Sequence, residues 1–142
     1  MDNKIKWKFV KDMPSLMDIE KVESRFNVKL PLDYIECVKK NNGGRPRPKL
    51  FDFGEYKEMV FSSLLSIIKD HKENVIDVYK WIGDRLPENT YPFAKDPFGN
   101  YLCFKYEGND VFVVFWNHEK SNEEEGIVFV SGSFKELLEK LH

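Results

Sequence analysis

Two dense apolar runs joined by a short polar turn place the strongest constraint on how this chain folds. Residues 101–106 (YLCFKY) and 111–116 (VFVVFW) are rich in β-branched and aromatic residues, which favour strands. The sequence EGND between them supplies a polar, glycine-containing turn, so we predict a β-hairpin. Both runs are nearly continuously apolar, and we therefore expect both faces of the hairpin to be covered by other parts of the protein.

Further strands are predicted on both sides of this hairpin. Residues 91–96 (YPFAKD) and 127–130 (IVFV) have the composition of strands, and 50–53 (LFDF) predicts a short strand or a strand edge. The residues PFGN at 97–100 predict a tight turn, because glycine at position 99 adopts a positive φ at little cost.

Helical periodicity appears at both ends of the chain and in its middle. Ser15 and Asp18 have the spacing of a capping box, Pro31 suits the first position of a second helix, and Ser133 begins a C-terminal helix. Residues 62–81 predict one broken helix or two short ones. The expected apolar stripe of the second helix is Leu32, Ile35 and Val38.

This order of elements predicts an α+β fold, with a mainly antiparallel sheet of four to six strands flanked by helices. The chain has 142 residues, of which 42% are apolar and 15% aromatic, enough to bury a hydrophobic core. We expect one domain over residues 1–142 that exists as a monomer or weak dimer.

Charge and cysteine usage narrow the functional classes. A net charge of −2 argues against nucleic acid or a membrane as the partner, and no apolar run approaches the length of a membrane span. The N-terminal residues 1–13 are too charged for a signal peptide. Cys37 and Cys103 lack metal-binding spacing, so we expect free thiols in a cytoplasmic protein.

Three segments resemble the SUKH superfamily in their order along the chain. These are LPLDYIECVKKNNGG at 30–44, YPFAKDPFGNYLCFKYEGND at 91–110 and VFVVFWNHE at 111–119, followed by the terminal helix. The resemblance covers nearly the whole chain from Ile19. The superfamily includes fungal cell-wall assembly regulators and many bacterial immunity proteins.

The resemblance implies a binding role without catalysis or a cofactor. Compact bacterial members of this superfamily look like antitoxins that neutralise a cognate toxin, often a nuclease, by noncovalent binding. We therefore expect an immunity protein that occludes a toxin. The alternative is a small regulatory or scaffold module that binds a cell-wall or signalling protein.

The candidate partner-binding residues lie at the polar end of the hairpin. Tryptophan is over-represented in interfaces, and an acidic patch would steer a basic, nucleic-acid-binding toxin. A buried tryptophan, an ordinary turn at position 96 and a solvated acidic loop are the structural alternatives. The candidates are Asp96, Asn100, Trp116, His118, Glu119, Glu123, Glu124 and Glu125.

Metal binding and catalysis find little support in the sequence. His118 and Glu119 are adjacent, so on a strand they would point to opposite faces, and the chain contains neither an HxxxH nor a CxxC motif. Asp96 could approach Glu119 if their strands were neighbours, but no motif supplies a nucleophile or an oxyanion site. We expect no metal site and no enzymatic activity.

A basic segment lies at residues 39–49, with the sequence KKNNGGRPRPK and a charge of +5. Prolines 46 and 48 predict that it is irregular, and they would stiffen it for binding to an acidic partner. A solvated connector is the structural alternative.

Overall fold

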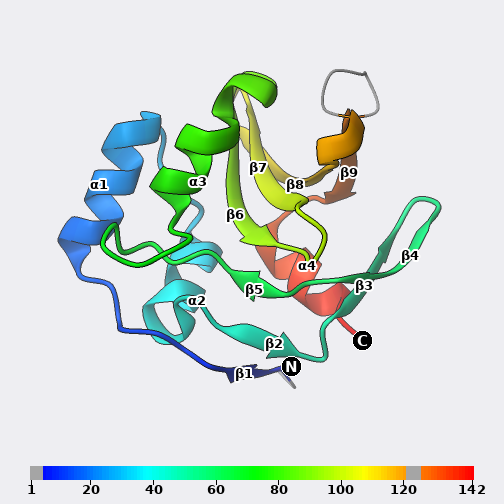
Figure 1. The fold of residues 1–142 in the computed structure, drawn as a ribbon, viewed down its shortest axis with the longest axis horizontal. Helices are drawn as coiled ribbons and strands as arrows, with labels where there is room; N and C mark the ends of the chain where they lie inside the picture. The colour runs from blue at the N-terminus through cyan, green and yellow to red at the C-terminus, as the bar shows by residue number, and fades with distance from the viewer. Residues whose placement is uncertain (1–4, 121–125) are drawn as a thin grey trace.

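A computed structural model describes residues 5–120 and 126–142. An antiparallel sheet of five strands lies at its centre, in the order β5-β6-β7-β8-β9, and the described chain also forms four α-helices (Figure 1). The predicted α+β class and the strand number are therefore confirmed. Within those ranges, none of the helices is both long and apolar enough to cross a membrane.

The predicted hairpin forms the middle of the central sheet. Strands β7 (Tyr101–Glu107) and β8 (Asp110–Trp116) pair from Tyr101 opposite Trp116 to Glu107 opposite Asp110. Outside them lie β6 (Thr90–Lys95) and β9 (Ile127–Ser131). Both faces of the hairpin are buried toward the end that carries Trp116, because consecutive residues there are buried. These residues are Leu102, Cys103, Phe104, Val113, Val114, Phe115 and Trp116.

Capping residues fix the starts of three helices. Ser15 and Asp18 form the predicted capping box of α1 (Leu16–Phe26). Ser133 caps α4 (Phe134–Lys140) by accepting a hydrogen bond from the Glu136 backbone. Asn74 caps α3 (Val75–Ile82) in the same way, and helices α1 and α3 lie side by side against the sheet (Figure 1).

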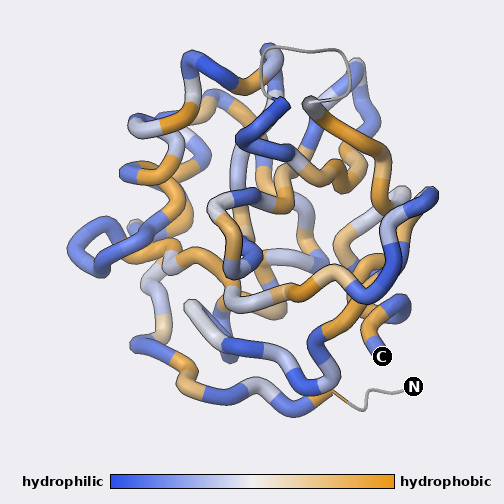
Figure 2. The backbone as a smooth tube through the Cα atoms, turned by 45° about the vertical axis from the view of Figure 1, so that its right-hand side comes forward, coloured by the Kyte–Doolittle hydropathy of each residue, from blue (hydrophilic) through white to orange (hydrophobic). Residues whose placement is uncertain are grey.

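An aromatic cluster joins the helices to the sheet. Tyr34, on α2 (Leu32–Asn41), makes edge contacts with Phe93, Phe104 and Phe134 at ring-centroid distances of 5.8, 5.0 and 5.5 Å. Leu32 is 77% exposed, so the prediction that it belongs to the buried stripe is wrong and Tyr34 takes that place. Hydrophobic stretches concentrate in the inner strands and hydrophilic stretches on the outer loops (Figure 2).

Two small sheets flank the central one. Strand β3 (Leu50–Phe53), which was predicted, pairs with β4 (Tyr56–Val60), which was not. Strand β1 (Lys6–Lys8) pairs with β2 (Arg45–Arg47), so the prediction of irregular structure at the prolines is wrong there. Pro46 faces Trp7 in this two-stranded ribbon, where each strand is an edge and a missing N–H donor is tolerated.

The third predicted helix is only half correct. Residues Ser63–Leu64 form the short strand β5, and the helix begins only at Val75. A loop between them is fixed by buried amide side chains. Asn42 Oδ1 accepts from the Ile67 backbone at 2.9 Å, and Asn74 Nδ2 donates to the backbone oxygens of Lys69 and His71 at 2.9 and 2.8 Å.

Candidate functional site

The turn between β6 and β7 is organised by the carboxylate of Asp96. Its Oδ1 accepts hydrogen bonds from the backbone N–H groups of Phe98 and Asn100, both at 2.8 Å, and its Oδ2 accepts from Asn100 Nδ2 at 2.8 Å. Gly99 has a φ of 89°, as predicted for this turn. Asp96 and Asn100 are both buried, so these polar contacts are shielded from water and hold the turn in one shape.

The same network extends to His118. Because Asn100 Nδ2 faces Asp96, its Oδ1 faces His118 and accepts from the histidine backbone N–H at 2.9 Å and from Nδ1 at 2.7 Å. Nδ1 therefore carries a proton in this arrangement. The β6–β7 turn is thus tied by hydrogen bonds to the segment that follows β8, which brings three of the candidate residues together: Asp96, Asn100 and His118.

His118 and Glu119 do not lie on a strand. They belong to a short 3₁₀ helix, His118–Lys120, so the expectation that they point to opposite faces of a strand is wrong. Glu119 is exposed, and its backbone N–H donates to Asn117 Oδ1 at 2.9 Å. Glu123, Glu124 and Glu125 lie outside the described residues, and their roles remain predictions.

Trp116 lies beneath this surface rather than on it. It is only 1% exposed, and its ring stacks on that of Tyr101 at 6.1 Å. The exposed-anchor interpretation of this residue is therefore wrong in this structure. Among the described residues, its indole Nε1 is the one buried side-chain nitrogen or oxygen that has no hydrogen-bond partner.

Arg85, which was not predicted from the sequence, connects the buried tryptophan to the surface. Its guanidinium carbon lies 5.1 Å from the centre of a Trp116 ring, and its Nη2 donates to the backbone oxygen of His118 at 2.8 Å. Arg85 ends a short 3₁₀ helix, Gly83–Arg85, that follows α3, so no local pattern in the sequence links it to position 116.

Phe98 is the exposed aromatic residue of the turn and was also missed. Its side chain is 71% exposed at the tip of a turn whose backbone is held by Asp96. The sequence did contain a signal for this residue. Turns favour Gly, Pro, Asn, Asp and Ser, so a phenylalanine at a turn position is unusual and is not explained by burial. We call Asp96, Phe98, Asn100, His118 and Glu119 the turn site.

A hollow of about 280 Å³ lies next to the turn site. An ion pair between Lys95 Nζ and Glu73 Oε1, 2.6 Å long, borders it. The hollow is also lined by Arg45, Ser62, Asp96, Pro97, Gly99 and Tyr101. It is small and polar, unlike the large apolar pockets that typically hold small-molecule ligands.

A chain of hydrogen bonds elsewhere in the protein has the residue types of a catalytic triad. Ser66 Oγ lies 2.8 Å from His71 Nδ1, and His71 Nε2 lies 3.3 Å from Asp12 Oδ2. The hydroxyl oxygen also accepts from Asn42 Nδ2 and from the Ile68 backbone, both at 3.1 Å. Ser66 is 1% exposed, so its hydroxyl oxygen is buried and already engaged in hydrogen bonds. These hydrogen bonds fix the 66–74 loop and do not present a nucleophile.

The two cysteines are free and poorly suited to nucleophilic chemistry. Burial raises the pKa of Cys37 to about 11, and burial also raises the pKa of the fully buried Cys103. A raised pKa keeps each sulfur in the less reactive thiol form at neutral pH. Across residues 5–120 and 126–142, no group of three or more His, Cys, Asp or Glu side chains is arranged to hold a metal ion.

Comparison with known proteins bears out the resemblance. The SMI1 / KNR4 family (SUKH-1) matches residues 13–140, which includes the turn site and all four helices. A curated relative, the SPbeta prophage-derived uncharacterized protein YokK of Bacillus subtilis (strain 168), is 24% identical over 140 residues, covering 84% of this chain and 70% of that protein. The family match spans most of the sequence, and the chain therefore belongs to the SMI1 / KNR4 family (SUKH-1).

Proposed function

We propose that this protein is an immunity protein that neutralises a cognate bacterial toxin by binding it. The SUKH family includes immunity proteins, and its domains can bind partner proteins. One relative is described as prophage-derived, an origin that is compatible with this proposal. The toxin is a nuclease in this proposal, because the acidic segment 119–125 complements a surface that binds phosphate.

The observation that carries the proposal is the rigid presentation of Phe98. The aromatic ring is exposed, while the turn beneath it is held by the buried hydrogen bonds of Asp96 and Asn100. A pre-organised turn loses little conformational entropy on binding, and an exposed aromatic side chain can supply most of the affinity. His118 and Glu119 add polar contacts at its side.

The mechanism is steric occlusion, with no covalent step. The turn site inserts Phe98 into a pocket of the toxin, and the body of the sheet covers the groove that would hold the toxin's substrate. Carboxylates around the contact accelerate association and select against partners with acidic surfaces.

The proposal is tested by recovery of the partner and growth protection. Tagged protein serves as bait in the organism that produces it, and each recovered partner is then expressed alone or together with this chain. Growth arrest that this protein relieves is the expected result. A recovered partner that causes no growth arrest, and that acts in the cell wall or in signalling, would instead favour the regulatory or scaffold alternative.

The site within the proposal is tested with two matched substitutions. Phe98→Ala is expected to weaken binding to the recovered toxin by about 2 kcal/mol or more, as removal of a central aromatic contact does. Phe129→Ala removes an aromatic side chain that is also exposed, at 58%, on the edge strand β9. Equal losses of affinity for both variants, or none for Phe98→Ala, would place the interface elsewhere.

A further inference from the structure

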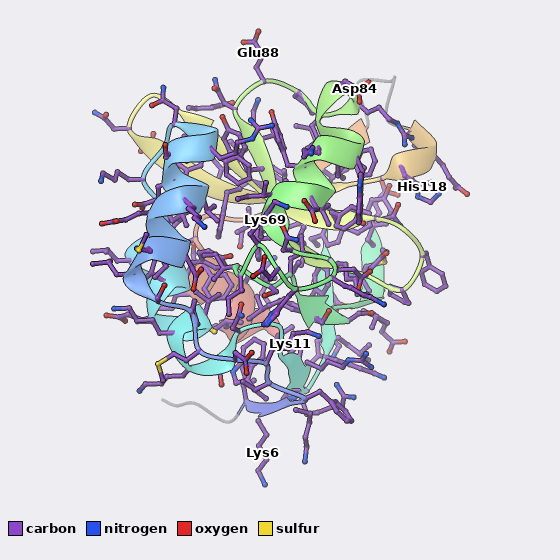
Figure 3. All side chains as sticks on the ribbon, turned by 60° about the vertical axis from the view of Figure 1, so that its left-hand side comes forward. Lys6, Lys11, Lys69, Asp84, Glu88 and His118 are labelled. Atoms are coloured by element: carbon purple, nitrogen blue, oxygen red, sulfur yellow. The ribbon has the colours of Figure 1, made fainter. Side chains whose placement is uncertain are left out.

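The two-stranded ribbon of β1 and β2 carries four cations on one face. Lys6 pairs with Arg47 and Lys8 with Arg45 directly across the strands, and all four side chains are exposed. Side chains alternate between the faces of a strand, so the residues between them, Trp7 and Pro46, share the opposite face. Figure 3 shows Lys6 projecting away from the protein, well separated from His118.

This arrangement of charge does not help the ribbon to fold. Like charges placed directly opposite each other on neighbouring strands repel and destabilise the pair. None of the four side chains forms an ion pair with another residue in the described ranges. Within the described part of the chain, the four positive charges are therefore not neutralised by a carboxylate.

The ribbon is held firmly in place from its inner face. Trp7 packs edge-on against the buried Phe61, with ring centroids 6.1 Å apart. The backbone N–H of Leu64 donates to the oxygen of Gly44 at 2.9 Å, which fixes the start of β2 against β5. A rigid support of this kind presents the four cations without the entropy cost of ordering a loop.

An unusual aromatic residue extends the cationic face. Phe9 directly follows β1 with a φ of 56°, a conformation rare for bulky residues, and its side chain is 74% exposed. The guanidinium of Arg45 lies 5.3 Å from the centre of its ring. Phe9 therefore brings an exposed apolar ring into contact with the cationic face, and the residues that follow it include two more exposed apolar side chains, Val10 and Met13.

We propose that this cationic ribbon, defined as Lys6, Lys8, Phe9, Arg45 and Arg47, binds a carboxylate-rich segment of a partner protein. Charge complementarity favours an anionic ligand, and the exposed apolar residues favour protein over nucleic acid. Each strand of the ribbon is only three residues long, so the four cations form a compact patch rather than the extended basic face that a nucleic-acid backbone requires. This surface goes beyond the proposed toxin contact, because it uses different elements and the opposite charge.

The test uses the full chain, labelled with ¹⁵N and titrated at low salt with a synthetic peptide rich in glutamate and leucine. We expect chemical-shift changes confined to the backbone amides of residues 6–11 and of Arg45 and Arg47, and no changes with a peptide that carries glutamine at each glutamate position. Shifts mapping elsewhere, or equal shifts with both peptides, would overturn the proposal. A single-stranded oligonucleotide that binds the same residues more tightly would overturn it in favour of nucleic acid.

Two double variants separate binding from folding. Lys6→Gln/Arg47→Gln is expected to weaken peptide binding about tenfold while leaving the melting temperature unchanged or raised, because repulsion across the ribbon is removed. The control, Lys21→Gln/Lys39→Gln, removes the same charge from exposed positions on α1 and α2 and is expected to retain full binding. Equal weakening in both would show a nonspecific charge effect and refute the site. If the first variant fails to fold, Lys8→Gln alone gives the same comparison against Lys21→Gln.

Self-association is the remaining outcome to distinguish. Analytical sedimentation of the wild-type protein reports whether it forms a dimer. If it does, and if Lys6→Gln/Arg47→Gln converts the dimer to monomer, then a second copy occupies the ribbon and the proposal is overturned. The peptide assay contains no toxin, so its failure leaves the proposed immunity function untouched, and loss of toxin binding by Phe98→Ala leaves the ribbon untouched.

Discussion

Asp96 acts through the geometry of its two oxygens rather than through its charge alone. The carboxylate acts only as an acceptor, in three hydrogen bonds: two from backbone N–H groups and one from Asn100 Nδ2. Asn100 in turn needs that acceptor, since its own oxygen is used by His118. A change at Asp96 should therefore reach His118 through one intervening side chain.

Asp96→Asn is expected to lower the free energy of unfolding by about 2 kcal/mol, because either rotamer of the new amide places N–H donors against donors. Urea denaturation measures the change. Asp110→Asn is the matched control at the exposed first residue of β8, with an expected effect within about 0.5 kcal/mol. Similar stability of the two variants would show that the buried network adds little.

Trp116 and Trp81 provide a second comparison between a buried and an exposed residue of one type. Trp116→Ala is expected to cost about 3–5 kcal/mol of stability, since it empties the space between Tyr101 and Arg85. Trp81 is 61% exposed on α3, and Trp81→Ala is expected to change stability by no more than about 0.5 kcal/mol. A stable Trp116→Ala protein with a defect only in partner binding would restore the interface interpretation of that residue.

At the scale of secondary structure, local sequence signals were sufficient to predict an element when its hydrogen-bond donors and acceptors lie close together in the sequence. The capping residues Ser15 and Ser133 and the hairpin at 101–116 were predicted because their donors, acceptors and turn residues are neighbours in sequence. Gly99 was predicted for the same reason, since its turn closes within a few residues.

Elements that depend on distant partners were predicted less well. The apolar run after Ser62 fits a strand or a helix equally by periodicity, and the choice is made by Asn42, which lies 25 residues before the Ile67 backbone that it binds. Strand β2 likewise exists only because β1, far away in sequence, pairs with it. The hydrogen-bonded network shows the same pattern: Asp96, Asn100 and His118 were among the candidates drawn from the sequence, while Arg85, which reaches His118 from 33 positions away, was not.

Helix α3 carries a pH-dependent contribution to stability at its first turn. The pKa of Asp77 is lowered from its usual value of 3.8 by hydrogen bonds from Lys69, first, and Asn74. A carboxyl group whose pKa is lower in the folded than in the unfolded state stabilises the protein above pH 3.8, and the effect is lost as pH falls through the folded-state pKa.

Asp77→Asn is therefore expected to reduce stability at neutral pH and to flatten the loss of stability on acidification below pH 3.8. Urea denaturation over a series of pH values measures both effects. Asp70→Asn, the same change at an exposed position in the preceding loop, is the control. If wild type and Asp77→Asn lost the same stability on acidification, Asp77 would not contribute to the pH dependence. Asp52 would then be the next residue to test, because its pKa is lowered chiefly by the Glu58 backbone N–H and next by His142.

At the scale of the whole molecule, opposite charges are concentrated in different parts of a chain whose net charge is only −2. The segment 39–49 carries +5, and two of its arginines lie on the cationic ribbon with Lys6 and Lys8. The segment 117–126 carries four glutamates and one lysine, and it begins at the turn site. A small net charge therefore gives a poor description of how this protein would meet a charged partner, because local fields govern the approach within a Debye length.

Glu123→Gln/Glu124→Gln/Glu125→Gln tests the acidic segment at this scale. If these carboxylates steer a basic toxin, the variant should associate with it more slowly at low salt and lose most of the salt dependence of the association rate, while the dissociation rate changes little. Stopped-flow mixing at several ionic strengths measures both rates. Glu20→Gln/Glu36→Gln/Glu139→Gln removes three charges from exposed helical positions and should retain the wild-type rate more closely, because those residues lie outside the segment that follows the turn site. An unchanged association rate for the first variant at low salt would mean that the partner approaches by another surface or without electrostatic steering.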